Sequence, residues 1–162
     1  KTSVMAVEIE RKFLVSDDGY RTASVGSIEM VQGYLAVERG RTVRVRIGGE
    51  KGFLTVKGPS ADGVSRSEWE YGIPVGEARE MLRLCDGVIE KVRYLVPVGG
   101  HTFEVDEFHG DNDGLVVAEI ELRSADESFK RPAWLGREVT GDRRYYNAHL
   151  VGEPYRLWRD RE

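Results

Sequence analysis

The sequence is poor in cysteine, histidine and long apolar runs, and each of these absences excludes a class of protein. The single cysteine, Cys85, excludes an internal disulfide and is compatible with a reducing cytoplasm. No apolar run approaches the roughly 18 residues that a membrane-spanning helix needs. The first residues also lack the continuous apolar core of a secretory signal. We therefore expect a cytoplasmic protein with no membrane partner.

Neither the histidines nor the net charge points to a zinc site or a nucleic-acid partner. His101, His109 and His149 lie at spacings that zinc sites do not use. The 24 basic and 28 acidic residues give a net charge of −4, so excess positive charge cannot drive binding to nucleic acid. Of the 162 residues 40% are hydrophobic, and no linker or repeat interrupts them, which predicts one domain over residues 1–162.

Apolar and polar residues alternate along most of the chain, which is the pattern of strands with two chemically different faces. The pattern predicts eight strands, at Val7–Leu14, Glu29–Ala36, Arg41–Ile47, Lys51–Lys57, Ser65–Tyr71, Ile89–Val96, Thr102–Phe108 and Leu115–Leu122. Short glycine-rich turns separate several of them and favour antiparallel neighbours, because a parallel crossover needs about a dozen residues or more. A mainly β (α+β) fold follows, either a sandwich or a closed barrel.

Three short segments have helical character and are expected to flank the sheet. Gly76–Cys85 places its apolar residues on one side, and Asp142–Val151 repeats this spacing near the end of the sequence. Ser124–Phe129 begins with an N-cap residue followed three positions later by a glutamate, and Pro132 limits its length.

Six of the eight predicted strands carry two charges of like sign at i and i+2 around an apolar residue. The pairs are Glu8 and Glu10, Arg44 and Arg46, Glu68 and Glu70, Lys91 and Arg93, Glu104 and Asp106, and Glu119 and Glu121. Like charges about 6.7 Å apart repel by roughly 2.5 kcal/mol at an effective dielectric constant of about 20, but by less than about 1 kcal/mol in water. The pattern fits either a solvated outer face with salt bridges, or an enclosed face on which acidic rows meet basic rows or bound ions.

The two signs of charge together suggest a ligand. Paired carboxylates suit hard divalent cations such as Mg²⁺ or Mn²⁺. Arginine and lysine side chains suit phosphate oxygens. A site that holds both kinds of side chain suits a metal complex of a polyphosphate, and a barrel with a polar interior provides such a site.

The charge pairs and their neighbours resemble the motifs of a known family. Glu8-Ile9-Glu10-Arg11-Lys12 is similar to the ExExK motif of the CYTH superfamily, the triphosphate tunnel metalloenzymes. The resemblance continues in order through Gln32-Gly33-Tyr34-Leu35, Val43-Arg44-Val45-Arg46, Leu54-Thr55-Val56-Lys57-Gly58, Ser67-Glu68-Trp69-Glu70, Glu90-Lys91-Val92-Arg93-Tyr94, Phe103-Glu104-Val105-Asp106, Val117-Ala118-Glu119-Ile120-Glu121, and from Gly136 to Asn147. Only residues 1–6 lie outside it. The resemblance implies an eight-stranded antiparallel closed barrel that forms a polar tunnel, with a few flanking helices.

The resemblance also implies a role for each charged motif position. The metal-binding carboxylates are Glu8, Glu10, Glu119 and Glu121, and they hold one or two Mg²⁺ or Mn²⁺ ions. The phosphate-binding residues are Lys12, Arg44, Arg46, Lys57, Lys91, Arg93 and Arg144, the last closing over one end. Lys12 and Tyr34 match a catalytic pair, although Tyr34 fits a packed barrel tyrosine equally well. As a mechanism we expect Glu8 or a neighbouring carboxylate to accept the proton of the attacking water. Further tunnel acids are Glu68, Glu70, Glu104 and Asp106.

These roles predict an enzyme that hydrolyses the terminal phosphoanhydride of a triphosphate with a divalent cation. The chain resembles the compact bacterial members that act on inorganic triphosphate, so tripolyphosphate is the leading substrate. A class IV-type adenylate cyclase, a thiamine triphosphatase and a polyphosphate-binding module without catalysis remain as alternatives. Intact metal carboxylates argue against the last of these, because binding a polyanion needs only the basic rows.

Overall fold

One antiparallel sheet of ten strands makes up most of the protein in this computed structural model, which describes residues 2–7, 9–59 and 65–161. The strands are β1 (Thr2–Val7), β2 (Ile9–Val15), β3 (Gly26–Glu38), β4 (Arg41–Gly48), β5 (Lys51–Lys57), β6 (Ser65–Ile73), β7 (Val88–Val98), β8 (His101–His109), β9 (Val116–Leu122) and β10 (Leu135–Glu138). The α-helices are α1 (Gly19–Ala23), α2 (Val75–Leu82) and α3 (Asn147–Gly152). Short 3₁₀ turns lie at Gly110–Asn112, Arg143–Tyr145, Tyr155–Leu157 and Arg159–Arg161.

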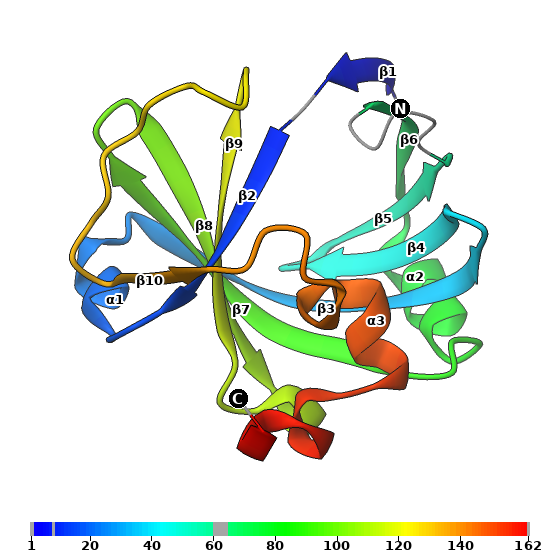
Figure 1. The fold of residues 1–162 in the computed structure, drawn as a ribbon. Helices are drawn as coiled ribbons and strands as arrows, with labels where there is room; N and C mark the ends of the chain where they lie inside the picture. The colour runs from blue at the N-terminus through cyan, green and yellow to red at the C-terminus, as the bar shows by residue number, and fades with distance from the viewer. Residues whose placement is uncertain (1, 8, 60–64, 162) are drawn as a thin grey trace.

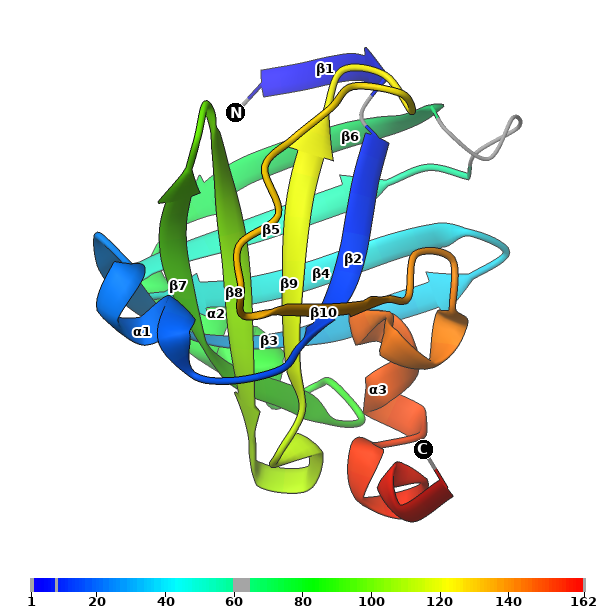
Figure 2. The same cartoon turned by 60° about the vertical axis from the view of Figure 1, so that its left-hand side comes forward.

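The strands follow the order β1-β6-β5-β4-β3-β7-β8-β9-β2-β10 in the sheet. The sheet bends, so that β8, β9 and β2 stand beside β4 to β6 in Figure 1 and cross in front of β3 to β6 in Figure 2. The N-terminal strands reach both parts of the sheet, since β1 pairs with β6 and β2 pairs with β9. The mainly β antiparallel prediction is confirmed. Closure into a barrel is not confirmed, because the order of the described strands is open and ends at β1 and β10.

Each of the eight predicted strands matches an observed one to within a few residues, and β1 and β10 are additional. The helix predicted at Gly76–Cys85 is α2, whereas the one predicted at Asp142–Val151 divides into a 3₁₀ turn and α3. The helix predicted at Ser124–Phe129 was wrong, because its capping glutamate bonds elsewhere. Glu127 accepts hydrogen bonds from the backbone N–H of Arg123 (2.6 Å) and from His101 (2.8 Å), which holds a turn. None of the helices in the described part of the chain is long and apolar enough to cross a bilayer.

The main hydrophobic core lies on the outer face of the strands β2, β7, β8 and β9. It contains the fully buried side chains of Phe13, Phe103, Val105 and Ala118, and Trp134 packs on it. Successive residues of a strand point to opposite faces. The charged residues that alternate with this core on the same strands therefore point to the inner face.

A second hydrophobic cluster closes one end of the inner face. Ile89, Phe108 and Val117 share that face with the charged residues, and Tyr145 and Leu150 cover them from the C-terminal part of the chain. Figure 2 shows α3 and the last turns beneath the sheet at this end. We call residues 140–148 the C-terminal segment, since they link this cluster to the inner face.

The short helix α1 is attached to the outer face by an ionic contact. The buried carboxylate of Glu107 on β8 accepts hydrogen bonds from the Tyr20 hydroxyl and from Arg21 Nε (2.6 Å). Burial alone would raise the pKa of Glu107, but the hydrogen bonds from Arg21 and Tyr20 outweigh burial and lower it. Since α1 has only five residues, we infer that this contact fixes its position.

Replacing Glu107 with Gln should lower the free energy of unfolding by about 1–3 kcal/mol at pH 7, because the partners of a buried carboxylate lose their acceptor. The pKa of Glu107 is depressed in the folded state, so its contribution is present above the unfolded pKa and is lost as the pH falls through the folded pKa. Urea unfolding should therefore show a smaller difference between wild type and E107Q at pH 3 than at pH 7. A difference that stays constant or grows toward acid would contradict this role.

Candidate functional site

The inner face of the sheet encloses a cavity of about 840 Å³. Its lining residues come from β2 to β9 and from the C-terminal segment: Ile9, Glu10, Lys12, Gln32, Tyr34, Thr42, Arg44, Arg46, Thr55, Lys57, Glu68, Glu70, Lys91, Arg93, Glu104, Glu119, Glu121, Thr140, Gly141, Tyr146, Asn147 and Ala148. Among these described residues six are basic and six are acidic. Of the two arrangements that fit the charge pairs, the enclosed face is the one observed.

Strand register places acidic side chains beside basic ones. Lys12 on β2 is the partner of Glu119 on β9, and Lys57 on β5 is the partner of Glu68 on β6. The ion pairs follow this register, with 2.5 Å between Lys12 Nζ and Glu119 Oε2 and 3.6 Å between Lys57 Nζ and Glu68 Oε1. Contacts of opposite sign between strands thus offset the repulsion of like charges within each strand.

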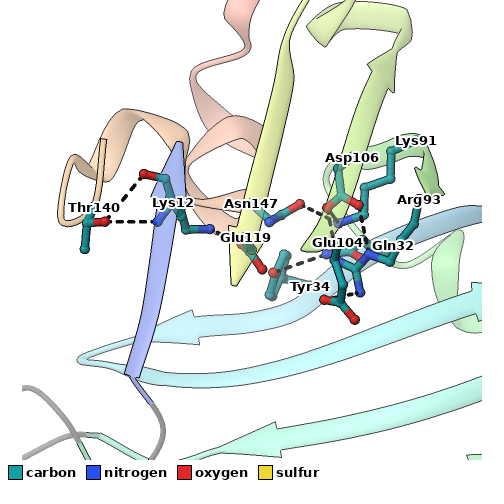
Figure 3. A network of polar contacts seen from close by, with 10 residues as sticks. All are labelled: Lys12, Gln32, Tyr34, Lys91, Arg93, Glu104, Asp106, Glu119, Thr140 and Asn147. Atoms are coloured by element: carbon teal, nitrogen blue, oxygen red, sulfur yellow. Dashed lines mark hydrogen bonds and ion pairs between the residues drawn. The ribbon is translucent and has the colours of Figure 1, made fainter. Parts of the chain in front are cut away.

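The most buried ion pairs lie where β7 meets β8. Asp106 binds Lys91 Nζ at 2.8 Å and also binds Arg93 Nε at 2.8 Å, and both contacts are drawn in Figure 3. The side chains of Lys91 and Asp106 are only 1% and 4% exposed. Burial alone would raise the pKa of Asp106, but Lys91 and Arg93 outweigh it and hold the pKa far below its usual range. Asp106 is therefore a carboxylate that fixes two phosphate-binding candidates from beneath the cavity.

Arg44 and Arg46 on β4 lie together beside a single carboxylate. Glu70 Oε1 is 3.7 Å from Arg44 Nη2 and 3.8 Å from Arg46 Nη2. Burial, together with repulsion from Arg44 and Arg93, lowers the pKa of Arg46 to about 10. The Nε atoms of both arginines are buried without a hydrogen-bond partner among the described residues. An unsatisfied buried donor is costly, so this pair of arginines is suited to an anion with several oxygens.

Lys12 is held by groups from two neighbouring elements. Its Nζ donates to Glu119, and its backbone N–H donates to Thr140 Oγ1 of the C-terminal segment at 2.9 Å. Burial alone would lower the pKa of Lys12, but the charges of Glu119 and Glu10 outweigh it and raise the pKa. Lys12 is therefore a cation at the cavity wall, and its Nζ lies 5.6 Å from the ring centre of Tyr146.

Tyr34 and Gln32 come from β3 and line the same wall. The Tyr34 hydroxyl accepts a long hydrogen bond from Gln32 Nε2 at 3.5 Å (Figure 3). Gln32 is 1% exposed, and its Oε1 is without a partner in the described structure. Tyr34 faces the cavity, as a catalytic residue requires, and its pairing with Lys12 remains a prediction.

The predicted metal ligands lie on β2 and β9. Glu10 and Glu121 are directly opposite each other in the antiparallel register, and Glu119 lies two residues from Glu121 on the same face. Carboxylates facing each other destabilise a sheet unless a cation reduces their repulsion, and oxygen donors suit Mg²⁺ or Mn²⁺. Glu8 lies outside the described residues. Within the described ones no group of three or more Asp, Glu, His or Cys is already placed around a metal position.

Two predicted site residues lie away from the cavity wall. Asp106 is beneath it, as described above, and Arg144 pairs with Asp142 at 2.7 Å with its guanidinium 5.2 Å from the Trp158 ring centre. Sequence reasoning assigned no role to several neutral lining residues: Gln32, Thr42, Thr55, Thr140, Tyr146 and Asn147. All of these except Thr42 lie in stretches quoted for the family resemblance, so their position was signalled but their role was not.

Fold and site together define an antiparallel β-protein with an interior of paired ionic side chains. The CYTH domain model matches residues 6–146. The chain therefore belongs to the CYTH family, whose triphosphatases depend on metal ions in general.

Two similar proteins and one similar crystal structure share a functional name. This chain is 52% identical over 158 residues to an inorganic triphosphatase of Acetivibrio thermocellus, covering 96% of this chain and 100% of that protein. It is 36% identical over 149 residues to an inorganic triphosphatase of Nitrosomonas europaea, covering 89% and 96%. A crystal structure of an inorganic triphosphatase aligns with a TM-score of 0.67 at 34% identity, covering 91% of this chain and 95% of that one.

Replacing Asp106 with Asn should lower the free energy of unfolding by about 3 kcal/mol, because it leaves two buried cations without their shared carboxylate. Urea unfolding at pH 7 measures this loss. Glu68→Gln is the matched control, since that carboxylate is 40% exposed and its removal should cost less than about 1 kcal/mol. Equal stability of D106N and the control would show that Asp106 does not balance the buried charges.

Proposed function

We propose that this chain is an inorganic triphosphatase that hydrolyses the terminal phosphoanhydride of tripolyphosphate with Mg²⁺ or Mn²⁺. The observation that carries the proposal is the cavity wall, where the partly buried Arg44 and Arg46 have buried Nε donors that no described protein group accepts. The carboxylates opposite one another on β2 and β9 are the second component. The names of the similar proteins agree with this activity.

The basic residues hold and orient the substrate. Arg44 and Arg46 offer guanidinium groups from β4, and Lys91 and Arg93 offer cations from β7. Lys57 and Lys12 extend the basic wall, whereas Arg144, which binds Asp142 and packs on Trp158, lies away from it. Such groups stabilise charge on the transferring phosphoryl group, which dominates catalysis of phosphoryl transfer.

The carboxylates Glu10, Glu119 and Glu121, with Glu8, are the residues that would hold one or two divalent cations. The chemistry supplied there is neutralisation of phosphate charge and an increase in the acidity of water. Glu8 accepts the proton of the attacking water, and Lys12 with Tyr34 assists the leaving phosphate. No covalent nucleophile is needed.

The interior is a tunnel in this proposal. Residues 2–7 pair with β6 and residues 9–15 pair with β9, so one segment lies along both parts of the sheet. Closure at this segment would place the motif at Glu8–Lys12 between the acidic strand β6 and the acidic strand β9. The tunnel acids Glu68, Glu70 and Glu104 then balance the basic residues when no substrate is present.

A cavity lined mainly by ions favours a bare polyphosphate over a nucleotide, whose base needs apolar or stacking surface. We therefore place the cyclase and thiamine triphosphatase activities second. The assay that follows distinguishes the three activities by their substrates and products.

Phosphate release should be fastest with tripolyphosphate when tripolyphosphate, ATP and thiamine triphosphate are compared, first with Mg²⁺ and then with Mn²⁺. Replacing Arg46 with Ala should lower kcat/KM for tripolyphosphate at least tenfold, because a buried guanidinium is lost from the phosphate site. Circular dichroism checks that the variant is folded. Cyclic AMP formed from ATP without free phosphate would support the cyclase instead, and no turnover of bound tripolyphosphate would support a binding module.

Replacing Glu121 with Gln should raise the Mg²⁺ concentration for half-maximal activity about tenfold or more, because the amide removes one charge from the carboxylate group. The measurement is a Mg²⁺ titration at saturating tripolyphosphate. Glu50→Gln, in the exposed turn between β4 and β5, is the control and should leave the titration unchanged. An unaltered titration for E121Q would remove Glu121 from the metal site.

A further inference from the structure

The C-terminal segment contributes one polar side chain that contacts a phosphate-binding candidate directly. Asn147 is the first residue of α3, and its Oδ1 accepts a hydrogen bond from Lys91 Nζ at 3.1 Å. Figure 3 shows the amide of Asn147 pointing toward Lys91 and Asp106. Both Asn147 and Lys91 line the cavity.

The contact leaves Lys91 with a defined direction for binding. A lysine ammonium has three N–H donors. Asp106 Oδ2 at 2.8 Å and Asn147 Oδ1 at 3.1 Å accept two of them in the described structure. Since the side chain of Lys91 is 1% exposed and borders the cavity, the remaining donor is directed to a ligand there.

The neutrality of Asn147 is as relevant as its position. The cations Lys91 and Arg93 are already matched by two carboxylates, because Asp106 binds both of them and Glu104 Oε1 lies 3.2 Å from Arg93 Nη1. A neutral amide orients the ammonium without adding a further negative charge that would repel a polyanion. A carboxylate at residue 147 would bind Lys91 equally well in geometry but would give these groups an excess negative charge.

The C-terminal segment is fixed firmly enough to impose this geometry. Tyr145, two residues before Asn147, is 1% exposed, and so is Leu150, three residues after it. Both are packed in the second hydrophobic cluster. Asn147 is thus placed by packed neighbours on both sides, which is the support that a precise binding group requires.

We propose that Asn147 is a positioning residue for the substrate site, which acts by orienting Lys91 toward a phosphate oxygen without adding a negative charge beside it. The inference rests on the proposed function, because it takes a polyphosphate as the ligand of Lys91. With this role for Asn147, the C-terminal segment belongs to the binding site as well as to the second hydrophobic cluster.

The test compares Asn147→Asp and Asn147→Leu, two substitutions of similar size that separate charge from hydrogen bonding. His149→Asp is the matched control, since it adds the same charge to an exposed position of the same helix. Binding of tripolyphosphate is measured by calorimetry without metal, and KM and kcat are measured with Mg²⁺.

Asn147→Asp should raise both Kd and KM at least tenfold while kcat changes less than threefold, because it adds a negative charge 3.1 Å from Lys91 Nζ that repels the polyanion. Asn147→Leu should raise Kd and KM about threefold to tenfold, since Lys91 keeps its charge but loses its orientation. His149→Asp should stay within twofold of wild type. Thermal unfolding of each variant confirms that it is folded.

Values for Asn147→Asp within twofold of wild type, or an equal loss in the His149→Asp control, would overturn the positioning role. If Asn147→Leu does not fold, Asn147→Asp and its control still decide the question. A wild-type protein that neither binds nor hydrolyses tripolyphosphate would instead overturn the proposed function. The experiment therefore distinguishes failure of the positioning role of Asn147 from failure of the proposed triphosphatase activity.

Discussion

Compensation of charge between neighbouring strands is the constraint on which the inner face depends. Alternation places like charges two residues apart, and strand register then sets carboxylates beside them, as with Asp106 between Lys91 and Arg93. The compensation is incomplete at Arg44 and Arg46, where buried donors lack acceptors among the described residues. In the proposed function these unpaired donors are the part of the sheet that binds the anion.

Much of the sheet could be predicted because the signal is local and periodic. The charge pairs alternate with apolar residues such as Val45 and Val105, which the structure buries on the opposite face. The strand β10 and helix α1 have no such periodicity, and their positions depend on tertiary contacts such as that of Glu107 with Tyr20. At Ser124–Phe129 the local capping pattern was misleading, since a distant histidine also binds Glu127.

The charged residues that line the cavity could be predicted from the sequence, whereas most of the neutral residues that line it could not. Lys12 and Arg46 line the cavity as their pattern indicated. Thr140 and Asn147 come from a segment without strand periodicity, and nothing in their spacing links them to Lys12 or Lys91. Closure into a barrel was expected from the family resemblance alone and is not confirmed, since the order of the described strands ends at β1 and β10.

The pairing of β2 with β9 has a consequence for how the molecule is made. Lys12 and Glu119 are separated by 107 positions in the sequence yet share one ion pair. During synthesis from the N-terminus, the first strand with site residues leaves the ribosome long before its partner exists, and contacts between distant segments form slowly. The cavity wall is consequently completed only after β9 has been synthesised, and a truncated chain that lacks β9 cannot assemble it.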